Sequence, residues 1–126
     1  MNYDPVFDKW HEECGVFGVY DRTVDVARYV YWGLFALQHR GQESAGIAVT
    51  DGHDVELKKG MGLLTEAIKE LPFLPSYMGT GHVRYSTTGS NNPRNIQPLV
   101  IHYQGGQIAV AHNGNLTNAL SIRKRL

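Results

Sequence analysis

Cys14 is the only cysteine in this 126-residue chain, so neither an internal disulfide nor a thiolate metal cage can hold its fold together. Two roles are left for the thiol: a small buried side chain or a nucleophile. An isolated cysteine is more often a small hydrophobic residue. The choice between the two roles therefore depends on the rest of the sequence.

Composition and charge exclude several classes of protein. The 12 basic and 12 acidic residues cancel, which leaves no excess positive charge for binding nucleic acid. No apolar stretch approaches the ~20 residues of a membrane-spanning helix, so no membrane partner is expected. Residues 1–13 are acidic overall and lack the apolar segment of a secretory signal. Together with the single free cysteine, this predicts a cytoplasmic protein.

The apolar pattern predicts at most one domain, of mixed α and β structure. Strands are expected at 14–20, 46–50, 55–59, 81–85, 98–103 and 107–112. Helices are expected at 24–37 and 63–71, the second of them ending before Pro72. A further helical pattern begins at Leu116 and reaches Leu126 without a capping residue, so we expect the chain to be a fragment of a longer protein.

One polar segment, residues 81–89, places Arg84 within a run that is otherwise typical of a strand. A guanidinium in such a run is costly unless it has an anionic partner. A surface ion pair is one explanation. We favour another, in which Arg84 grips the carboxylate of a ligand and the Thr87 hydroxyl adds a hydrogen bond.

Two more polar segments interrupt the apolar pattern. Residues 38–46 form a dense polar loop, which a solvated turn carrying a helix-terminal arginine would also explain. Residues 112–115 contain the pair Asn113-Gly114, which often forms a tight hairpin turn. At the end of a strand, an asparagine amide and a glycine N–H can also donate two hydrogen bonds to an oxyanion.

Six histidines raise the question of a metal site. None has a ligand spacing typical of zinc sites with Cys14 or with another histidine, and the sequence contains no His-Glu-x-x-His motif. We therefore predict no metal site in this chain. A glycine-rich phosphate loop of the Walker type is also missing from the sequence.

Taken in order, four segments closely resemble class II glutamine amidotransferases, which are N-terminal-nucleophile hydrolases: residues 14–18, 37–47, 81–87 and 111–116. The resemblance covers residues 12–126. It implies an α+β fold, the four-layer αββα sandwich, in which two antiparallel sheets face each other and helices cover the outside. We expect this sandwich to be truncated at its C-terminus.

The resemblance also implies how the nucleophile works. Cys14 would attack the glutamine carboxamide and form a γ-glutamyl thioester, while the side chain of Asn113 and the N–H of Gly114 stabilise the oxyanion. The α-amine of Cys14 would serve as the base, because an α-amine with a pKa of about 7.7–8.0 is partly neutral near physiological pH. Residues 1–13 would then be a propeptide, removed after Glu13, and residues 14–126 a partial amidotransferase domain.

Substrate binding follows in the same way from the resemblance. Arg84 and Thr87 would hold the α-carboxylate of glutamine, and Arg40 and Gly41 would shape the wall beside the nucleophile. The family's aspartate for the α-amine is expected beyond Leu126, so the chain by itself is expected to show negligible turnover.

Gln42 favours one branch of the family. Glucosamine-6-phosphate synthases usually carry tyrosine at that position. The branch that Gln42 favours transfers the released ammonia to phosphoribosyl pyrophosphate, which is the first committed step of purine synthesis. The resemblance then implies a second domain with Mg²⁺ and a homo-oligomer. No cofactor is expected in this segment, and an iron–sulfur cluster in the longer protein is left open.

Three alternatives stay open at this point. Glucosamine-6-phosphate synthase and other amidotransferases of the family share the glutaminase motifs. A hydrolase could instead pair Cys14 internally with His82 or His112. A non-catalytic module of the same fold would use Cys14 only as a packing residue.

Overall fold

The computed structural model describes residues 13–85, 92–114 and 116–126. Its strands are β1 (Gly15–Tyr20), β2 (Ser44–Thr50), β3 (Val55–Met61), β4 (Met78–Arg84), β5 (Leu99–Tyr103) and β6 (Gly106–Val110). Its α-helices are α1 (Val26–Ala36), α2 (Leu64–Ala67) and α3 (Ala119–Arg123). Two short 3₁₀ turns, η2 (Gln38–Arg40) and η3 (Pro93–Asn95), complete the elements.

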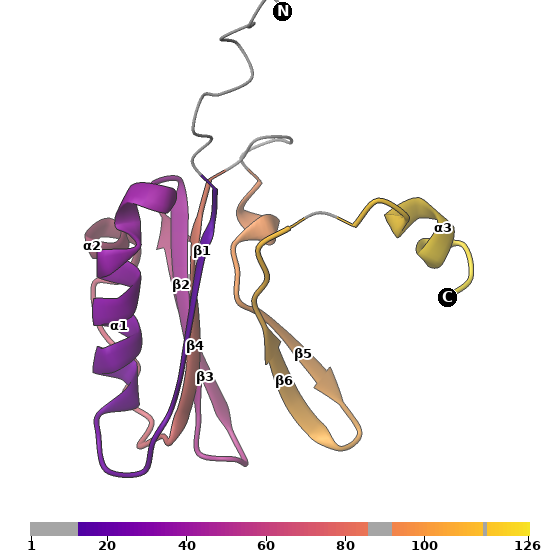
Figure 1. Ribbon diagram of the computed structural model, residues 1–126. Coiled ribbons are helices and arrows are strands. Elements are labelled where there is room, and N and C mark those ends of the chain that lie inside the picture. The colour runs from indigo at the N-terminus through magenta and orange to yellow at the C-terminus, as the bar shows by residue number, and fades with distance from the viewer. Residues whose placement is uncertain (1–12, 86–91, 115) are drawn as a thin grey trace, which may run out of the picture.

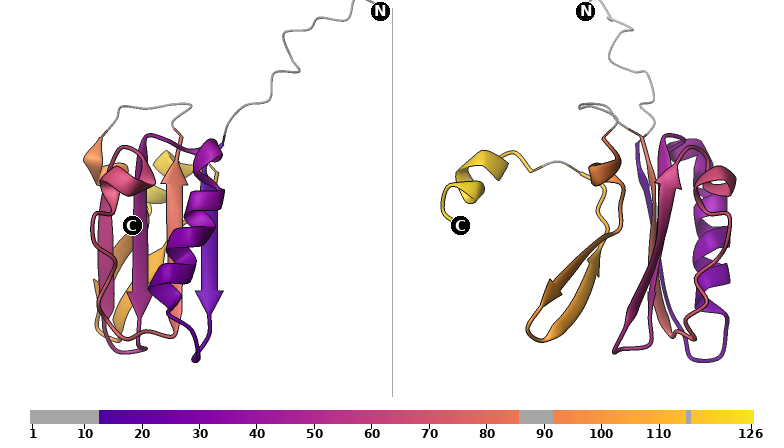
Figure 2. Two further views of the ribbon diagram at one scale, coloured as in Figure 1. Left: turned by 90° about the vertical axis from the view of Figure 1, so that its left-hand side faces the viewer. Right: turned by 180° about the vertical axis from the view of Figure 1, so that it is seen from behind.

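The elements are stacked in layers. Strands β1 to β4 form an antiparallel four-stranded sheet in the order β1-β4-β2-β3, and β5 and β6 form a separate antiparallel hairpin. Helices α1 and α2 cover one face of the four-stranded sheet, the hairpin lies over its other face, and α3 lies beyond the hairpin (Figures 1 and 2). The order of helix, sheet and second sheet agrees with the αββα layering that the resemblance implies, and α3, whose residues are all exposed, lies on the side where the fourth layer is expected.

The hydrophobic core lies between α1 and the four-stranded sheet. Asp25 caps α1 by accepting a hydrogen bond from the Arg28 N–H, 3.1 Å away. The apolar stripe of the helix is then buried, with Val30 and Leu34 fully inaccessible and packed in one cluster with Ile47 and other residues of the sheet. Because α1 covers this face of the sheet, only the opposite face is open to the hairpin and to polar residues.

The predicted helix at 63–71 is wrong in its length. The helix ends at Ala67, and Ile68 already has non-helical angles of φ −117° and ψ 83°. In this conformation Ile68 is almost fully buried in the core, and Leu71 packs against the same cluster. Tertiary packing of these two side chains, rather than Pro72, therefore ends the helix.

Strand register brings the polar segments to one end of the sheet. Gly15 pairs with Val83, and Ser44 pairs with Arg84. The start of β1, the start of β2 and the end of β4 consequently lie at the same end of the sheet. Cys14, the loop before β2 and Tyr85 are adjacent for this reason.

Side chains connect the hairpin to the four-stranded sheet. Gln107 Oε1 accepts a hydrogen bond from the Val55 N–H at 2.8 Å, and Lys59 Nζ donates at 2.9 Å to the carbonyl of Ile96, in the segment that leads into the hairpin. These bonds hold the second layer in place before the chain reaches His112. In the part of the chain that the structure describes, no helix is long and apolar enough to cross a membrane.

Candidate active site

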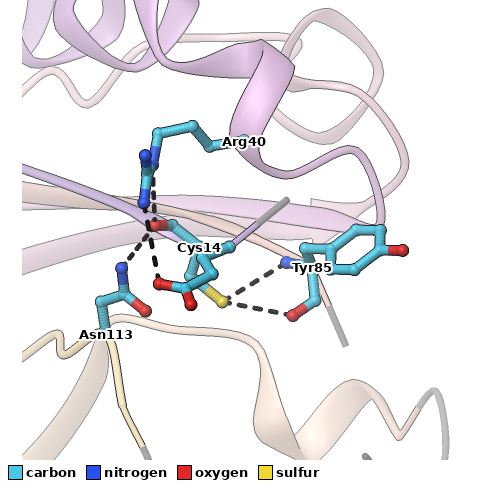
Figure 3. Close-up of polar contacts among 5 residues, drawn as sticks. Cys14, Arg40, Tyr85 and Asn113 are labelled. Carbon is cyan, nitrogen blue, oxygen red and sulfur yellow. Dashed lines mark hydrogen bonds and ion pairs between the residues drawn. The ribbon is translucent and has the colours of Figure 1, made fainter. Parts of the chain in front are cut away.

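Cys14 lies immediately before β1, with its thiol against the backbone of Tyr85. Cys14 Sγ donates to the Tyr85 carbonyl at 3.3 Å, and the Tyr85 N–H donates back to Sγ at 3.4 Å (Figure 3). The residue is partly exposed rather than fully buried. A thiol that is held by backbone groups and still open to solvent fits a nucleophile better than a core spacer.

Two side chains from distant segments converge on the carbonyl oxygen of Cys14. Asn113 Nδ2 donates to it at 2.7 Å and Arg40 Nε at 3.3 Å (Figure 3). Arg40 also lies 4.0 Å from the Glu13 carboxylate, an ion pair open to solvent that contributes little to stability. Arg40 from the polar loop and Asn113 from the turn after β6 therefore meet at the Cys14 peptide.

The turn that carries Arg40 approaches β4 closely at Gly41. A Cβ atom on Gly41 would lie 2.7 Å from backbone atoms of Arg84, closer than any side chain is accommodated. Two residues later, the Glu43 N–H donates to the Arg84 carbonyl at 3.1 Å. Glycine at position 41 thus lets this loop pack directly on the end of β4.

Arg84 ends β4 and is partly buried. Within residues 13–85, 92–114 and 116–126, no carboxylate forms an ion pair with its guanidinium. A partly buried cation of this kind suits an anionic ligand, so its role in binding a carboxylate stays a prediction. Thr87, its expected partner, lies outside the described residues.

The expected oxyanion donors occupy an exposed turn after β6. Gly114 has φ of 151°, a backbone conformation that favours glycine. Asn113 Nδ2 donates to the carbonyl oxygen of Cys14, so it lies beside the nucleophile but is engaged by the protein itself. Their role as an oxyanion hole stays a prediction.

His82 is the buried histidine of this region, 1% exposed on β4. Burial lowers its pKa from 6.5 to about 4, with smaller contributions from the charges of His112 and Arg84, while the backbone of His112 raises it. The hydrogen bonds of Cys14 Sγ go to Tyr85 rather than to this imidazole or to His112. This geometry does not favour an internal cysteine–histidine pair.

The low pKa of His82 predicts that acid destabilises the protein. The folded state keeps the imidazole neutral down to about pH 4, whereas the unfolded chain takes up a proton below about pH 6.5. The contribution of the neutral His82 to the free energy of unfolding is therefore complete above pH 6.5. It falls by on the order of 3 kcal/mol as the pH is lowered to 4. Urea unfolding at several pH values checks this.

Replacement variants separate His82 from the other titrating groups. His82→Gln should flatten the pH dependence of the unfolding free energy between pH 4 and 6.5. His39→Gln, which removes an exposed histidine from η2, is the matched control for the loss of a histidine. Equal pH curves for His82→Gln and the unsubstituted protein would contradict a neutral buried imidazole.

No three His, Cys, Asp or Glu side chains come close enough to hold a metal ion in the described ranges. The described side chains of the site offer a thiol, an arginine and hydrogen-bond donors.

Comparison with known proteins identifies the family. The family described as glutamine amidotransferases class-II matches residues 38–125. The chain belongs to the class II glutamine amidotransferases. Residues 38–125 include Arg40, Gly41, Arg84, Asn113 and Gly114, so most of the candidate site lies within the match.

Individual relatives of this class II amidotransferase are similar along most of its length. The amidophosphoribosyltransferase of Methanocaldococcus jannaschii is 50% identical over 116 residues, which cover 90% of this chain and 25% of that protein. That of Synechococcus elongatus is 49% identical over 121 residues, which cover 94% and 24%. The chain thus spans about a quarter of the length of these relatives.

Solved structures show the same fold. The glutamine phosphoribosylpyrophosphate amidotransferase of B. subtilis, in complex with ADP and GMP, superposes with a TM-score of 0.77 and 42% identity. The match covers 87% of this chain and 24% of that one. The fold of this amidotransferase is accordingly that of the N-terminal-nucleophile hydrolases, as predicted.

Two contributors to the site, Tyr85 and Gln38, are not among the residues that the sequence pattern singles out. Tyr85 acts through its backbone N–H and carbonyl, which no side-chain pattern reveals. The Gln38 side chain donates to the Gly41 carbonyl in its own turn and accepts from the Leu64 N–H at the start of α2. Its position at the start of the polar loop is the signal that could have indicated it.

Proposed function

We propose that this chain is the glutamine-hydrolysing part of an amidophosphoribosyltransferase. The observation that carries the proposal is the convergence of Asn113 and Arg40 on the Cys14 peptide, with the thiol held by Tyr85. Four separate segments contribute to this arrangement, which a packing role for Cys14 does not require. The family match and the named relatives support the same activity.

The proposed reaction starts at the thiol. Cys14 Sγ attacks the carboxamide carbon of glutamine while the neutral α-amine of Cys14 takes the thiol proton. Asn113 and Gly114 donate to the oxygen of the tetrahedral intermediate; losing one such donor typically costs about 3–4 kcal/mol of barrier. Collapse of the intermediate releases ammonia, which takes the proton back from the amine, and leaves a γ-glutamyl thioester. Water then hydrolyses the thioester to glutamate.

We propose that Arg84 orients the substrate. Its guanidinium takes the α-carboxylate of glutamine, and Thr87 adds a hydrogen bond. Arg40 and Gly41 form the adjacent wall, since the turn that contains them packs on the end of β4 and on the Cys14 peptide. Asn113 must exchange the Cys14 carbonyl for the substrate oxygen in this scheme.

Processing is part of the proposal, because the amine exists only once Cys14 is the first residue. While Glu13 is attached, the nitrogen of Cys14 is an amide and cannot act as a base. We expect active protein to begin at Cys14, with residues 1–13 removed. Intact mass and N-terminal sequencing check this, and fully active protein that retains Met1 would contradict it.

The acceptor of the ammonia is proposed from Gln42 and from the relatives' names. Phosphoribosyl pyrophosphate with Mg²⁺ would bind in a part of the longer protein outside this chain. Full-length protein should convert glutamine and phosphoribosyl pyrophosphate to glutamate and phosphoribosylamine. Formation of glucosamine 6-phosphate from fructose 6-phosphate, without the first reaction, would instead assign the protein to another branch of the family.

A further inference from the structure

Gln38 connects two backbone segments through its side-chain amide. Nε2 donates to the Gly41 carbonyl at 2.5 Å, and Oε1 accepts from the Leu64 N–H at 2.7 Å. Leu64 is the first residue of α2 and its side chain is completely buried in the core. The amide therefore joins the turn at 38–41 to a fixed point of the fold.

The turn that Gln38 joins to α2 carries contacts of the candidate site. Arg40 donates to the carbonyl of Cys14, and Gly41 packs on the backbone of Arg84. The turn's own backbone bonds are short-range: the Arg40 N–H donates to the Leu37 carbonyl, and the Gly41 N–H donates to the Gln38 carbonyl. These close the turn but do not connect it to α2. The Gln38 side chain supplies that connection.

We propose that Gln38 is a positioning residue for the glutaminase step, which anchors the turn at 38–41 to α2 and so sets where Arg40 meets the Cys14 peptide. The proposal rests on the proposed function. Gln38 touches no reacting atom and acts through Arg40 and Gly41. An amide suits the position because it offers a donor to a carbonyl and an acceptor to an N–H at once.

The test uses a matched pair of glutamines in the full-length protein. Gln107 also joins two elements, since Oε1 accepts from the Val55 N–H and Nε2 contacts His102 Nδ1 at 3.0 Å. Gln38→Met and Gln107→Met each lose two side-chain hydrogen bonds and should have similar effects on the melting temperature. Gln38→Met alone should lower kcat with glutamine about tenfold, because the turn that places Arg40 beside the Cys14 peptide loses its connection to α2. Ammonia-dependent synthesis should be unchanged in both.

Two further variants test the route through Arg40. Gln38→Glu keeps the acceptor for Leu64 but turns an oxygen towards the Gly41 carbonyl, so its kcat should fall at least as far. Added to Arg40→Ala, Gln38→Met should lower kcat by less than twofold further. Equal kinetic effects of Gln38→Met and Gln107→Met, or full additivity with Arg40→Ala, would overturn the proposal.

A second readout separates this proposal from the proposed function. Iodoacetamide alkylation of Cys14, followed by peptide mass spectrometry, reports the placement of the thiol whether or not glutamine is a substrate. Gln38→Met should change the alkylation rate at Cys14 severalfold, and Gln107→Met should not. If the unsubstituted protein showed no glutaminase activity, the proposed function would be contradicted. If the alkylation rate of Cys14 were unchanged in Gln38→Met, the anchoring role of Gln38 would be contradicted.

Discussion

Replacing Cys14 with alanine in the full-length protein should abolish glutamine-dependent synthesis and leave ammonia-dependent synthesis nearly intact. Without the thiol no thioester can form, so glutamine turnover should fall by at least about a thousandfold. Free ammonia bypasses this step and needs only the acceptor site. Product formation with glutamine and with ammonia as nitrogen donors, measured side by side, checks the prediction.

A packing role for Cys14 predicts a different result. Loss of a buried thiol would then cost a modest amount of stability, about 1–2 kcal/mol, and would impair both activities together or neither. Melting temperatures of the two proteins provide the control. A Cys14→Ala variant that keeps glutamine-dependent activity would contradict the nucleophile outright.

Arg84→Ala should raise the KM for glutamine by about a hundredfold or more. Removing one partner of a desolvated guanidinium–carboxylate pair costs about 3–5 kcal/mol, and each 1.4 kcal/mol is a factor of ten. Ammonia has no carboxylate, so the ammonia-dependent rate should stay close to that of the unsubstituted protein. Steady-state kinetics with each nitrogen donor measures both values.

Arg94→Ala is the matched control for this substitution. Arg94 lies in η3 and is exposed, and it is not one of the candidate site residues. Its removal should change neither KM. If Arg84→Ala lowered the glutamine and ammonia activities equally, Arg84 would have a folding role at the end of β4 instead.

Local patterns predicted most of the elements because each carries its own signal. The stripe that includes Val30 and Leu34 marks α1 by its spacing, and Asp51-Gly52 marks the turn between β2 and β3. The length of α2 could not be read in this way. Burial of Ile68 and Leu71 in the core decides it, and that depends on segments distant in the sequence.

The sequence singles out candidate residues but not their contacts. Cys14, Arg40, Arg84 and Asn113 stand out because polar residues interrupt apolar runs at those points, and the resemblance implies their roles, which stay predictions. That Asn113 and Arg40 share one acceptor, the Cys14 carbonyl, depends on tertiary structure: the register of β1, β2 and β4 places Arg40, and the position of the β5-β6 hairpin over the sheet places Asn113. Backbone contacts such as those of Tyr85 have no side-chain signature, so only the fold reveals them.

The most direct test of the account is covalent labelling of the full-length protein with a glutamine analogue that carries a diazoketone. An N-terminal nucleophile at Cys14 predicts one adduct, on a peptide that begins with Cys14 and carries the label on its sulfur. Cys14→Ala should acquire no label. An adduct at another residue, or one on a Cys14 that still follows Glu13, would contradict the account.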